Sequence, residues 1–514
     1  MTTDGPASDR ADRLTESRSL AKTGGTSFAG AAVSAFMGFV LTFVVARAFG
    51  EYGAGTVLQS IAAFSITLGL VKFGMDSVGI WLMPRLMVSD PGQIRGALTF
   101  MLTTVVVGGG VGGVVLAAIA PVIAGPEAPD LTAALRLLAW FVPPGAVMIT
   151  ALAATRGLGG ILTYVLVGSI GVSVSRPVLV VLVALLGGTA SVAVGAWALP
   201  VTVGMVAALL VLGRQVRRLE PEGQRPRWWL PAEQRRSIVR FAIPRTVSVG
   251  LEQSVLWLDV VLVGILAGTA SAGIYGGASR LIAAGLIIDT AIRVVVSPRF
   301  SSFLHQHKLD SAQNLYRIAA MWLVVFSTPI YIVLGVFAPT VLNWLGEGFV
   351  AGAPVLGVLA VGSVITMAAG NIHSVLLMSG HSGWAAVNKL VVLVLNVVAN
   401  VILVPWIGII GAAIAWAVSM IVDALLAAFE VRLLVGIRVE LRAVSYALII
   451  PLVTVGGSGA LFQAIAGRDS LLAMVLTIVV GGLLMLAWCV IDRRRLNFDL
   501  WRMRAEGASA RSAG

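Results

Sequence analysis

Fourteen stretches of this chain are long and apolar enough to cross a lipid bilayer. A spanning helix needs about 20 mostly apolar residues. By this criterion the expected spans are 25–46, 54–74, 97–121, 132–155, 162–187, 190–213, 242–266, 273–297, 318–340, 353–378, 385–405, 409–432, 443–464 and 471–491. Only 12% of the 514 residues are charged, against about 25% in soluble domains. The sequence therefore predicts an all-α integral membrane protein with fourteen transmembrane helices.

Lysine and arginine are distributed unevenly between the two sides of these spans. With a cytoplasmic N-terminus, the inner side holds eight arginines in 214–240 and six after Ile491. The outer side holds Arg47 and Arg468, with Arg136 at a helix end. Because cytoplasmic loops are enriched in Lys and Arg, both termini are expected in the cytoplasm and the spans in the cytoplasmic membrane. The net charge of +12 then reflects topology and contact with membrane lipids, not nucleic-acid binding.

A basic segment divides the chain into two parts. It contains Trp228 and Trp229 among arginines, and it is either an interfacial anchor or an ordinary linker along the inner surface. The stretches LTFVVARAFGEYGAGTVLQSIAAF and LDVVLVGILAGTASAGIYGGASRLIAAG, one on each side of it, are weakly alike. Six helices separate them, so a repeat would place both halves in the same orientation. The expected parts are a cytoplasmic polar tail 1–23, a six-helix bundle 24–213, the linker 214–241, a second six-helix bundle 242–433, two extra transmembrane helices 434–491 and a basic cytoplasmic tail 492–514.

Four stretches, in this order, resemble the polysaccharide (lipid-linked oligosaccharide) flippases of the multidrug/oligosaccharidyl-lipid/polysaccharide exporter superfamily. They are VVARAFGEYGAGTVLQ, KFGMDSVGIWLMPRL, FAIPRTVSVGLEQSVLWLDVVLVGILAGTASAGIYGGASRL, and the segment from Gly352 to Val422 with its Leu-Met-Ser-Gly turn and PWIGIIGAAIAWA. The resemblance covers residues 24–435. One position departs from the family pattern. A few residues after GMD, where the family often has a basic residue, this chain has Trp81, so no role of a cation is carried over.

The resemblance implies a fold and a function. The implied fold is two pseudo-symmetric six-helix bundles around a central cavity, followed by two extra C-terminal helices. The implied function is transport of a polyprenyl-(pyro)phosphate-linked oligosaccharide from the inner to the outer leaflet by alternating access, for cell-surface polysaccharide or glycan biosynthesis. The expected partners are this substrate, membrane lipids, H⁺ or Na⁺ as coupling ion, and glycosyltransferases or a polymerase of the same pathway.

Eight ionisable residues lie well inside the expected spans. They are the acids Glu252, Asp259, Asp289 and Asp423 and the cations Arg176, Arg280, Arg293 and Lys389. Charges in spans usually face the protein interior or a wet cavity and pair with one another. Asp289 and Arg293 are four residues apart, which predicts an ion pair that is either structural or part of the transport path. Arg176 is too deep to reach the interface, whereas Lys389 is close enough to the inner face to do so.

Cations and amides are the candidate substrate-binding groups. A cation suits an anionic pyrophosphate, and an asparagine either binds sugar hydroxyls or packs between helices. The substrate-binding candidates are Arg176, Arg280, Arg293, Asn371 and Asn388.

The four acids are the candidates for binding a coupling ion or gating the cavity. Glu252 and Asp259 are seven residues apart and therefore share a helical face at a separation of about 10 Å. They either bind H⁺ or Na⁺ or pair structurally with buried arginines. Burial raises the proton affinity of a carboxylate, which favours a proton site. Asp289 and Asp423 complete the set, and Asp423 has no partner near it in sequence.

Three alternative functions remain. A lipid II flippase of the same superfamily also has fourteen helices, whereas a cation-coupled multidrug exporter typically has twelve. A membrane-embedded glycosyltransferase or polymerase would need catalytic acids in aqueous loops, and the expected outer loops carry only scattered single acids. No enzyme activity and no catalytic residue are therefore expected. The single Cys489 and the spacing of the four histidines match no metal motif, so neither a metal site nor a cofactor is expected.

Overall fold

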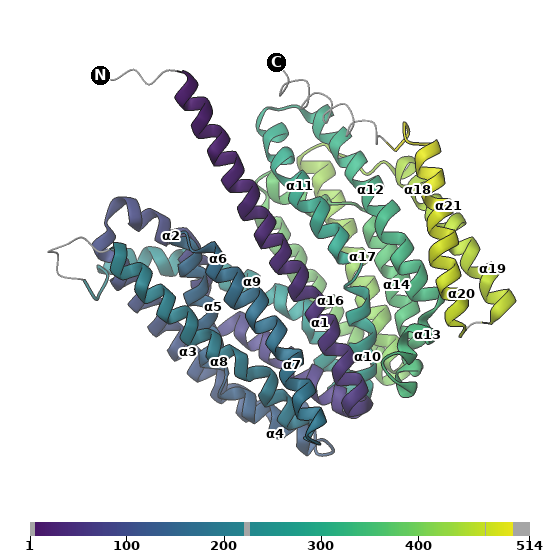
Figure 1. Cartoon of the computed structure of the whole chain (residues 1–514), viewed down its shortest axis with the longest axis horizontal. Coiled ribbons are helices and arrows are strands. Elements are labelled where there is room, and N and C mark those ends of the chain that lie inside the picture. The colour runs from purple at the N-terminus through teal and green to yellow at the C-terminus, as the bar shows by residue number, and fades with distance from the viewer. Residues whose placement is uncertain (1–5, 220–226, 468, 497–514) are drawn as a thin grey trace. The chain divides into compact units, whose positions relative to one another are not determined.

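The computed structural model of the chain describes residues 6–219, 227–467 and 469–496, and within these ranges it contains helices and turns but no strand (Figure 1). Parts of three expected regions lie outside the described residues: 1–5 of the N-terminal tail, 220–226 of the linker and 497–514 of the C-terminal tail. Arg468 also lies outside them. The chain divides into two compact units, Met1–Val261 and Leu262–Gly514.

The first unit is a bundle of long helices. Its elements are α1 (Pro6–Val71), α2 (Met75–Ser89), a 3₁₀ turn (Pro91–Gln93), α3 (Ile94–Ala124), α4 (Pro129–Ala139), α5 (Val142–Gly157), α6 (Ile161–Thr163), a π-helical segment (Tyr164–Gly171), α7 (Val172–Leu185), α8 (Ala190–Leu219) and most of α9 (Ala232–Ala267). The boundary between the units falls inside α9.

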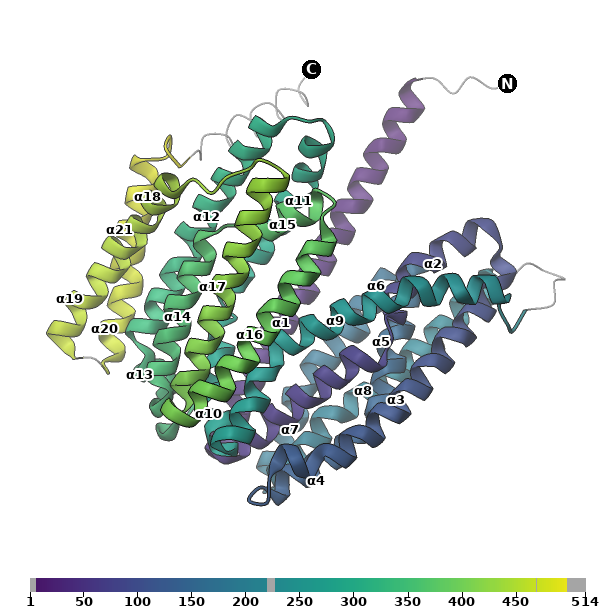
Figure 2. The ribbon, with the colours of Figure 1, turned by 180° about the vertical axis from the view of Figure 1, so that it is seen from behind.

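Gly50 breaks helix α1 into two spans. Its backbone angles, φ 65° and ψ −169°, are not helical, and the left-handed φ suits a residue without a Cβ. The apolar part of α1, Ala29–Val71, has 43 residues, which at 1.5 Å per residue is about twice the thickness of the hydrocarbon core. Figure 2 shows the dark second half of α1 running back beside α5 and α7.

The span count agrees with the sequence. Among the described residues, 11 helices are long and apolar enough to cross a membrane, or up to 13 if each of two bent helix pairs forms one span. Counting the two halves of α1 separately gives the fourteen spans that the sequence predicts. The prediction of an all-α, multi-pass membrane fold is thus confirmed.

Glycines allow α3 to pack against the bent pair α4–α5. The pair is bent by 47°, where Pro143 opens helix α5. A Cβ added at Gly113 would lie 2.6 Å from the Ala139 carbonyl oxygen, and one at Gly109 would lie 2.7 Å from the Pro143 Cα. The neighbouring Gly110 has no atom within 4 Å of such a Cβ. One face of the glycine-rich stretch therefore brings two backbones into contact, as small residues do between membrane helices.

The second unit has the same order of long and broken helices as the first. Its elements are α10 (Thr269–Ile282), α11 (Leu286–His305), α12 (Leu309–Val336), α13 (Ala338–Asn343), a 3₁₀ turn (Glu347–Gly352), α14 (Ala353–Ala368), α15 (Ile372–Met378), α16 (Ser382–Ile407) and α17 (Ile409–Leu434). In both units a glycine with positive φ, Gly50 or Gly268, precedes a helix that a three-residue gap then interrupts. The gaps are 72–74 and 283–285, and this agreement strengthens the weak repeat seen in the sequence.

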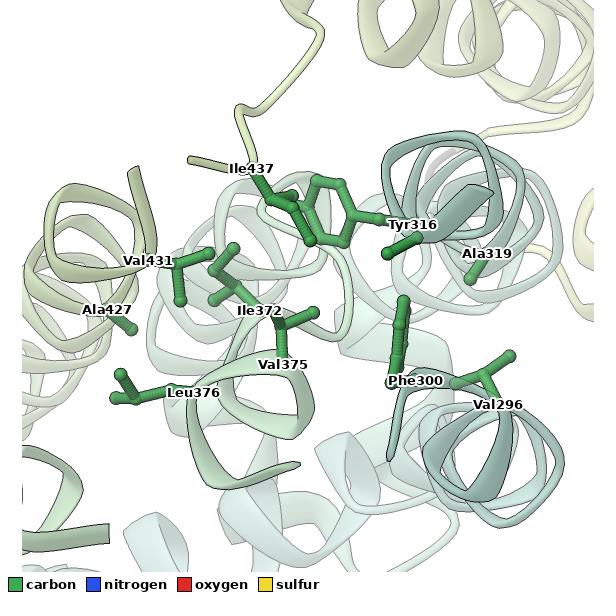
Figure 3. Close-up of a cluster of buried hydrophobic side chains, with 11 residues drawn as sticks. Val296, Phe300, Tyr316, Ala319, Ile372, Val375, Leu376, Ala427, Val431 and Ile437 are labelled. Carbon is green, nitrogen blue, oxygen red and sulfur yellow. The ribbon is translucent and has the colours of Figure 1, made fainter. Parts of the chain in front are cut away.

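A buried cluster holds the broken helix α14–α15 in place (Figure 3). Tyr316 of α12 and Phe300 of α11 are 1% and 0% exposed, and they pack with Ile372 and Val375 of α15. The Tyr316 hydroxyl donates a hydrogen bond to the Ala369 carbonyl oxygen at 2.5 Å. This carbonyl lies in the gap between α14 and α15, so the tyrosine satisfies a backbone group that the broken helix leaves open.

Two further spans pack against α12. They consist of α18 (Leu441–Pro451), a π-helical segment (Leu452–Gly456), α19 (Gly457–Ala466), α20 (Leu471–Leu476), a second π-helical segment (Thr477–Gly481) and α21 (Gly482–Ile491). Val324 and Val325 of α12 share a core with Ala447, Ile450 and Cys489. This pair corresponds to the two extra C-terminal helices that the resemblance implies.

Candidate functional site

Arg176 lies over an aromatic ring in the first unit. Its guanidinium carbon is 4.0 Å from the centroid of the Trp197 ring, which α8 contributes. Trp197 in turn meets Phe64 of α1 edge-on, with the ring centroids 5.6 Å apart. A guanidinium over a tryptophan face is attracted by the ring quadrupole. Trp197, itself held by Phe64, therefore fixes the position of the arginine side chain.

Among the residues that the structure describes, the Arg176 guanidinium has no counter-ion. Within the described residues no carboxylate lies within ion-pair distance of it, and its Nε is buried with no hydrogen-bond partner. The π-helical segment Tyr164–Gly171 ends five residues before Arg176, and such segments are frequent at functional sites. Because a buried charge normally has a partner, this arrangement is suited to receiving an anion.

Trp81, the position that departs from the family pattern, forms a stack in the first unit. Its ring lies parallel to that of Phe241 at 4.7 Å, and the Arg85 guanidinium lies 4.4 Å from the Trp81 centroid. A positive group therefore sits one helical turn from the position at which the family often has one. Nearby, Arg245 donates a hydrogen bond to the Ser77 hydroxyl at 2.9 Å.

Asp289, Arg293 and Asn371 meet in the second unit. Asp289 and Arg293 form the ion pair that their spacing predicts. The other carboxylate oxygen of Asp289 accepts a hydrogen bond from Asn371 Nδ2 at 2.8 Å. Asp289 is buried in the first turn of α11, whereas the Arg293 side chain is 58% exposed. Asn371 ends the gap between α14 and α15, so two of the proposed substrate-binding residues contact one of the proposed ion-binding residues.

Asp423 has partners that the sequence did not reveal. Its Oδ2 is 2.5 Å from Lys389 Nζ on α16 and 3.1 Å from His373 Nε2 on α15. The interpretation of Lys389 as a side chain that reaches for the inner interface is therefore wrong. Its ammonium is bound to a buried carboxylate of the adjacent helix.

Asn388 donates a hydrogen bond to the Glu430 carboxylate at 2.7 Å, and both side chains are buried. Neither Glu430 nor His373 was among the expected site residues. Helices α16 and α17 form an antiparallel pair around Gly408. Asn388 lies 20 residues before this glycine and Glu430 22 residues after it. Their near-equal separation from the turn was the available signal, since such positions lie side by side in a helical hairpin.

The remaining candidates lie on α9 and α10. On α9, Glu252 is exposed and Asp259 is 5% exposed, although both belong to the same helix. Arg280 is half-buried in the last turn of α10. Within the described ranges, no group of three or more His, Cys, Asp or Glu side chains is placed to hold a metal ion.

Comparison with known protein families gives a match over more than half of the chain. The model of a family described as polysaccharide biosynthesis protein matches residues 20–304. Among curated proteins, the probable low-salt glycan biosynthesis flippase Agl15 of Haloferax volcanii is 27% identical over 229 residues. The match covers 44% of this chain and 48% of the relative. The probable flippase AglR of the same organism is 26% identical over 176 residues, 33% of this chain and 37% of the relative. The chain thus matches about half the length of these relatives or less.

Solved structures share the fold. A structure of the lipid II flippase MurJ in an inward closed conformation has a TM-score of 0.66 at 14% identity, covering 92% of this chain and 99% of its own. An inward-facing multidrug resistance transporter of the MATE family has a TM-score of 0.59 at 15% identity, covering 80% and 96%. At these identities the likeness concerns the fold alone.

Proposed function

Because this chain belongs to the polysaccharide biosynthesis protein family, we propose that it is a flippase for a lipid-linked saccharide. In this proposal it moves a polyprenyl-(pyro)phosphate-linked oligosaccharide from the inner to the outer leaflet of the cytoplasmic membrane by alternating access. Both termini lie in the cytoplasm. The glycan serves cell-surface polysaccharide or glycan biosynthesis, and glycosyltransferases or a polymerase of the pathway supply or use the substrate.

The observation that carries this proposal is the uncompensated charge of Arg176. A cation inside a membrane span is costly and normally pairs with an acid. Arg176 instead lies against Trp197 and has no carboxylate within ion-pair distance among the described residues. The pyrophosphate of a lipid-linked sugar would supply the missing negative charge. The planar guanidinium can bind two phosphate oxygens at once, an advantage over an ammonium group.

The other cations and amides have secondary roles in the proposal. Arg280 and Arg293 are further candidates for contact with the anionic head group, and the exposed side chain of Arg293 is accessible to it. Asn371 and Asn388 already donate to carboxylates, so they support the walls of the path more readily than they donate to a sugar. Transport of this kind breaks and forms no covalent bond in the substrate, and the proposal requires no catalytic residue or cofactor.

Two alternatives make different predictions about the substrate. Lipid II carries the same pyrophosphate group. A contact between Arg176 and the pyrophosphate therefore cannot distinguish lipid II from another lipid-linked saccharide, because the two differ only in their sugars. A cation-coupled multidrug exporter would accept organic cations, which a buried arginine without a counter-ion repels. The observation at Arg176 therefore favours an anionic lipid substrate over a cationic drug.

The test is transport by the purified chain in liposomes. A fluorescent polyprenyl-pyrophosphate oligosaccharide, lipid II and a cationic dye are each supplied from one side, and their appearance on the other side is followed over time. We expect movement of the pyrophosphate-linked oligosaccharide and none of the dye. Transport of the dye alone would overturn the proposal. Transport of lipid II alone would show that the substrate is the peptidoglycan precursor and not another lipid-linked oligosaccharide.

A further inference from the structure

Asp423 has one oxygen with two nitrogen neighbours and one with none. Lys389 Nζ and His373 Nε2 both approach Oδ2, at 2.5 Å and 3.1 Å. The second oxygen, Oδ1, is buried and has no hydrogen-bond partner in the described parts of the chain. The residue as a whole is 3% exposed. The contacts that the structure shows for this carboxylate are therefore all made through Oδ2.

The charges around Asp423 do not balance while His373 is neutral. Glu430, 7% exposed and two helical turns further along α17, adds a second carboxylate. Within the described residues its hydrogen-bond partner is the neutral amide of Asn388, and no cation lies within ion-pair distance. Lys389 compensates only one of the two negative charges. One proton on His373 brings the sum of these four groups from −1 to zero.

Other charged groups lie on the helices around His373, among them the exposed Arg299 of α11 and the exposed Arg432 of α17. Helix α15, which carries His373, packs against α11, α16 and α17, and its Ile372 and Val375 also meet Tyr316 of α12. From α11 come Asp289 and Arg293, which form an ion pair with each other. From α16 comes Lys389, and from α17 come Asp423 and Glu430. Because a net charge in a low-dielectric interior is costly, the site as a whole favours one added positive charge.

The burial of Asp423 and its contact with Lys389 favour a proton over a larger cation. The Asp423 Oδ1 atom is sealed from solvent, so a sugar cannot reach it in this state. The Lys389 ammonium already occupies the cation position at Oδ2, and a sodium ion there would be repelled by it. A proton needs no such space. The imidazole side chain is 34% exposed, which gives a proton a path to the buried carboxylate through a ring nitrogen that can accept it.

We propose that His373, Asp423 and Lys389, together with the neighbouring Glu430, form a binding site for one proton, and that this is the coupling ion of the transporter. His373 accepts the proton at a ring nitrogen, and the resulting imidazolium pairs with Asp423. In competing for Oδ2, it weakens the bond between Lys389 and Asp423 that ties α16 to α17. The first half of this proposal concerns proton binding alone, and the second half rests on the proposed function.

Proton binding is tested without any substrate. The full chain is labelled with ¹³C at the histidine ring and purified in detergent, and the resonances of His373 and His381 are assigned from the signals that H373Q and H381Q remove. We expect the His373 resonance to change with pH, and D423N to displace that change while leaving the His381 resonance unaffected. E430Q, which keeps the shape of the side chain, should displace it as well and serves if D423N does not fold. The proposal is overturned if the His373 chemical shift does not change with pH, or if neither substitution alters that change.

Coupling is tested in liposomes with an imposed pH gradient. We expect the gradient to accelerate transport of the lipid-linked saccharide by the unchanged protein and by H381Q. H373Q should lose that acceleration, so that its transport rate is the same with and without the gradient. Transport by the unchanged protein that ignores the gradient overturns the coupling role and leaves the flippase function standing. Absence of any saccharide transport would contradict the flippase function, while the histidine titration would still decide proton binding.

Discussion

Asn371 donates a hydrogen bond to Asp289 across 82 residues of sequence, and the bond joins two interrupted helices. Asp289 follows the gap between α10 and α11, and Asn371 closes the gap between α14 and α15. The segment that begins with Asn371 also carries His373, which approaches Asp423 on α17. Two neighbouring positions of one short segment thus connect two buried carboxylates on different helices. A movement of this segment would change both contacts together.

Removal of this bond should destabilise the second unit. In Asn371→Ala, Asp289 Oδ1 loses its amide donor while remaining buried, a cost of about 1–3 kcal/mol. Asn371→Asp places a second carboxylate against the first and should cost more. Asn314→Ala is the matched control, because Asn314 makes an exposed bond to Arg317. Thermal unfolding of the purified variants in detergent measures the difference. Equal midpoints for N371A and N314A would contradict the structural importance of the bond.

The sequence was sufficient for what depends on local spacing. Hydropathy located the spans, and the four-residue separation of Asp289 and Arg293 predicted their ion pair. The partners of Asp423 depended on the register between helices, because Lys389 lies 34 residues away and on a different helix. A one-residue rotation of α16 by 100° would have turned this side chain elsewhere. Spacing along one helix is fixed by its geometry, whereas spacing between helices is decided by packing.

The charge of Arg176 should matter for transport more than for folding. Arg176→Lys keeps the charge but loses the planar contact with Trp197, so it should retain part of the transport activity. Arg176→Ala should retain little. Arg156→Ala is the control, since Arg156 lies over the Tyr164 ring at 5.3 Å. The rate of saccharide transport is measured at matched protein levels. Full transport activity of R176A would show that the role of this arginine is purely structural.

Glu252 and Asp259 should both be needed for transport, although only Asp259 is buried. We expect Glu252→Gln and Asp259→Asn to keep protein abundance while lowering transport, as a role in ion binding or gating requires. A structural role instead predicts reduced abundance, and only for the buried Asp259, because the exposed Glu252 has little to lose from neutralisation. Abundance in the membrane and transport per molecule are measured for both variants and for the double variant. Full transport and unchanged abundance of the double variant would exclude both roles.

The glycine-rich face of α3 offers the sharpest test of the packing in the first unit. Replacement of a glycine by alanine in a helix normally stabilises it by about 0.5–1 kcal/mol, so Gly110→Ala, with open space around its Cβ, should be neutral or slightly stabilising. Gly113→Ala should be destabilising by about 1–3 kcal/mol, because its Cβ would lie 2.6 Å from the Ala139 carbonyl oxygen. A backbone atom cannot move aside as the end of a side chain can, so relief would require α3 to separate from the bend between α4 and α5. Thermal unfolding in detergent and abundance in the membrane should both be lower for G113A than for G110A. Equal values for the two variants would show that the helices do not approach as closely as their backbones indicate.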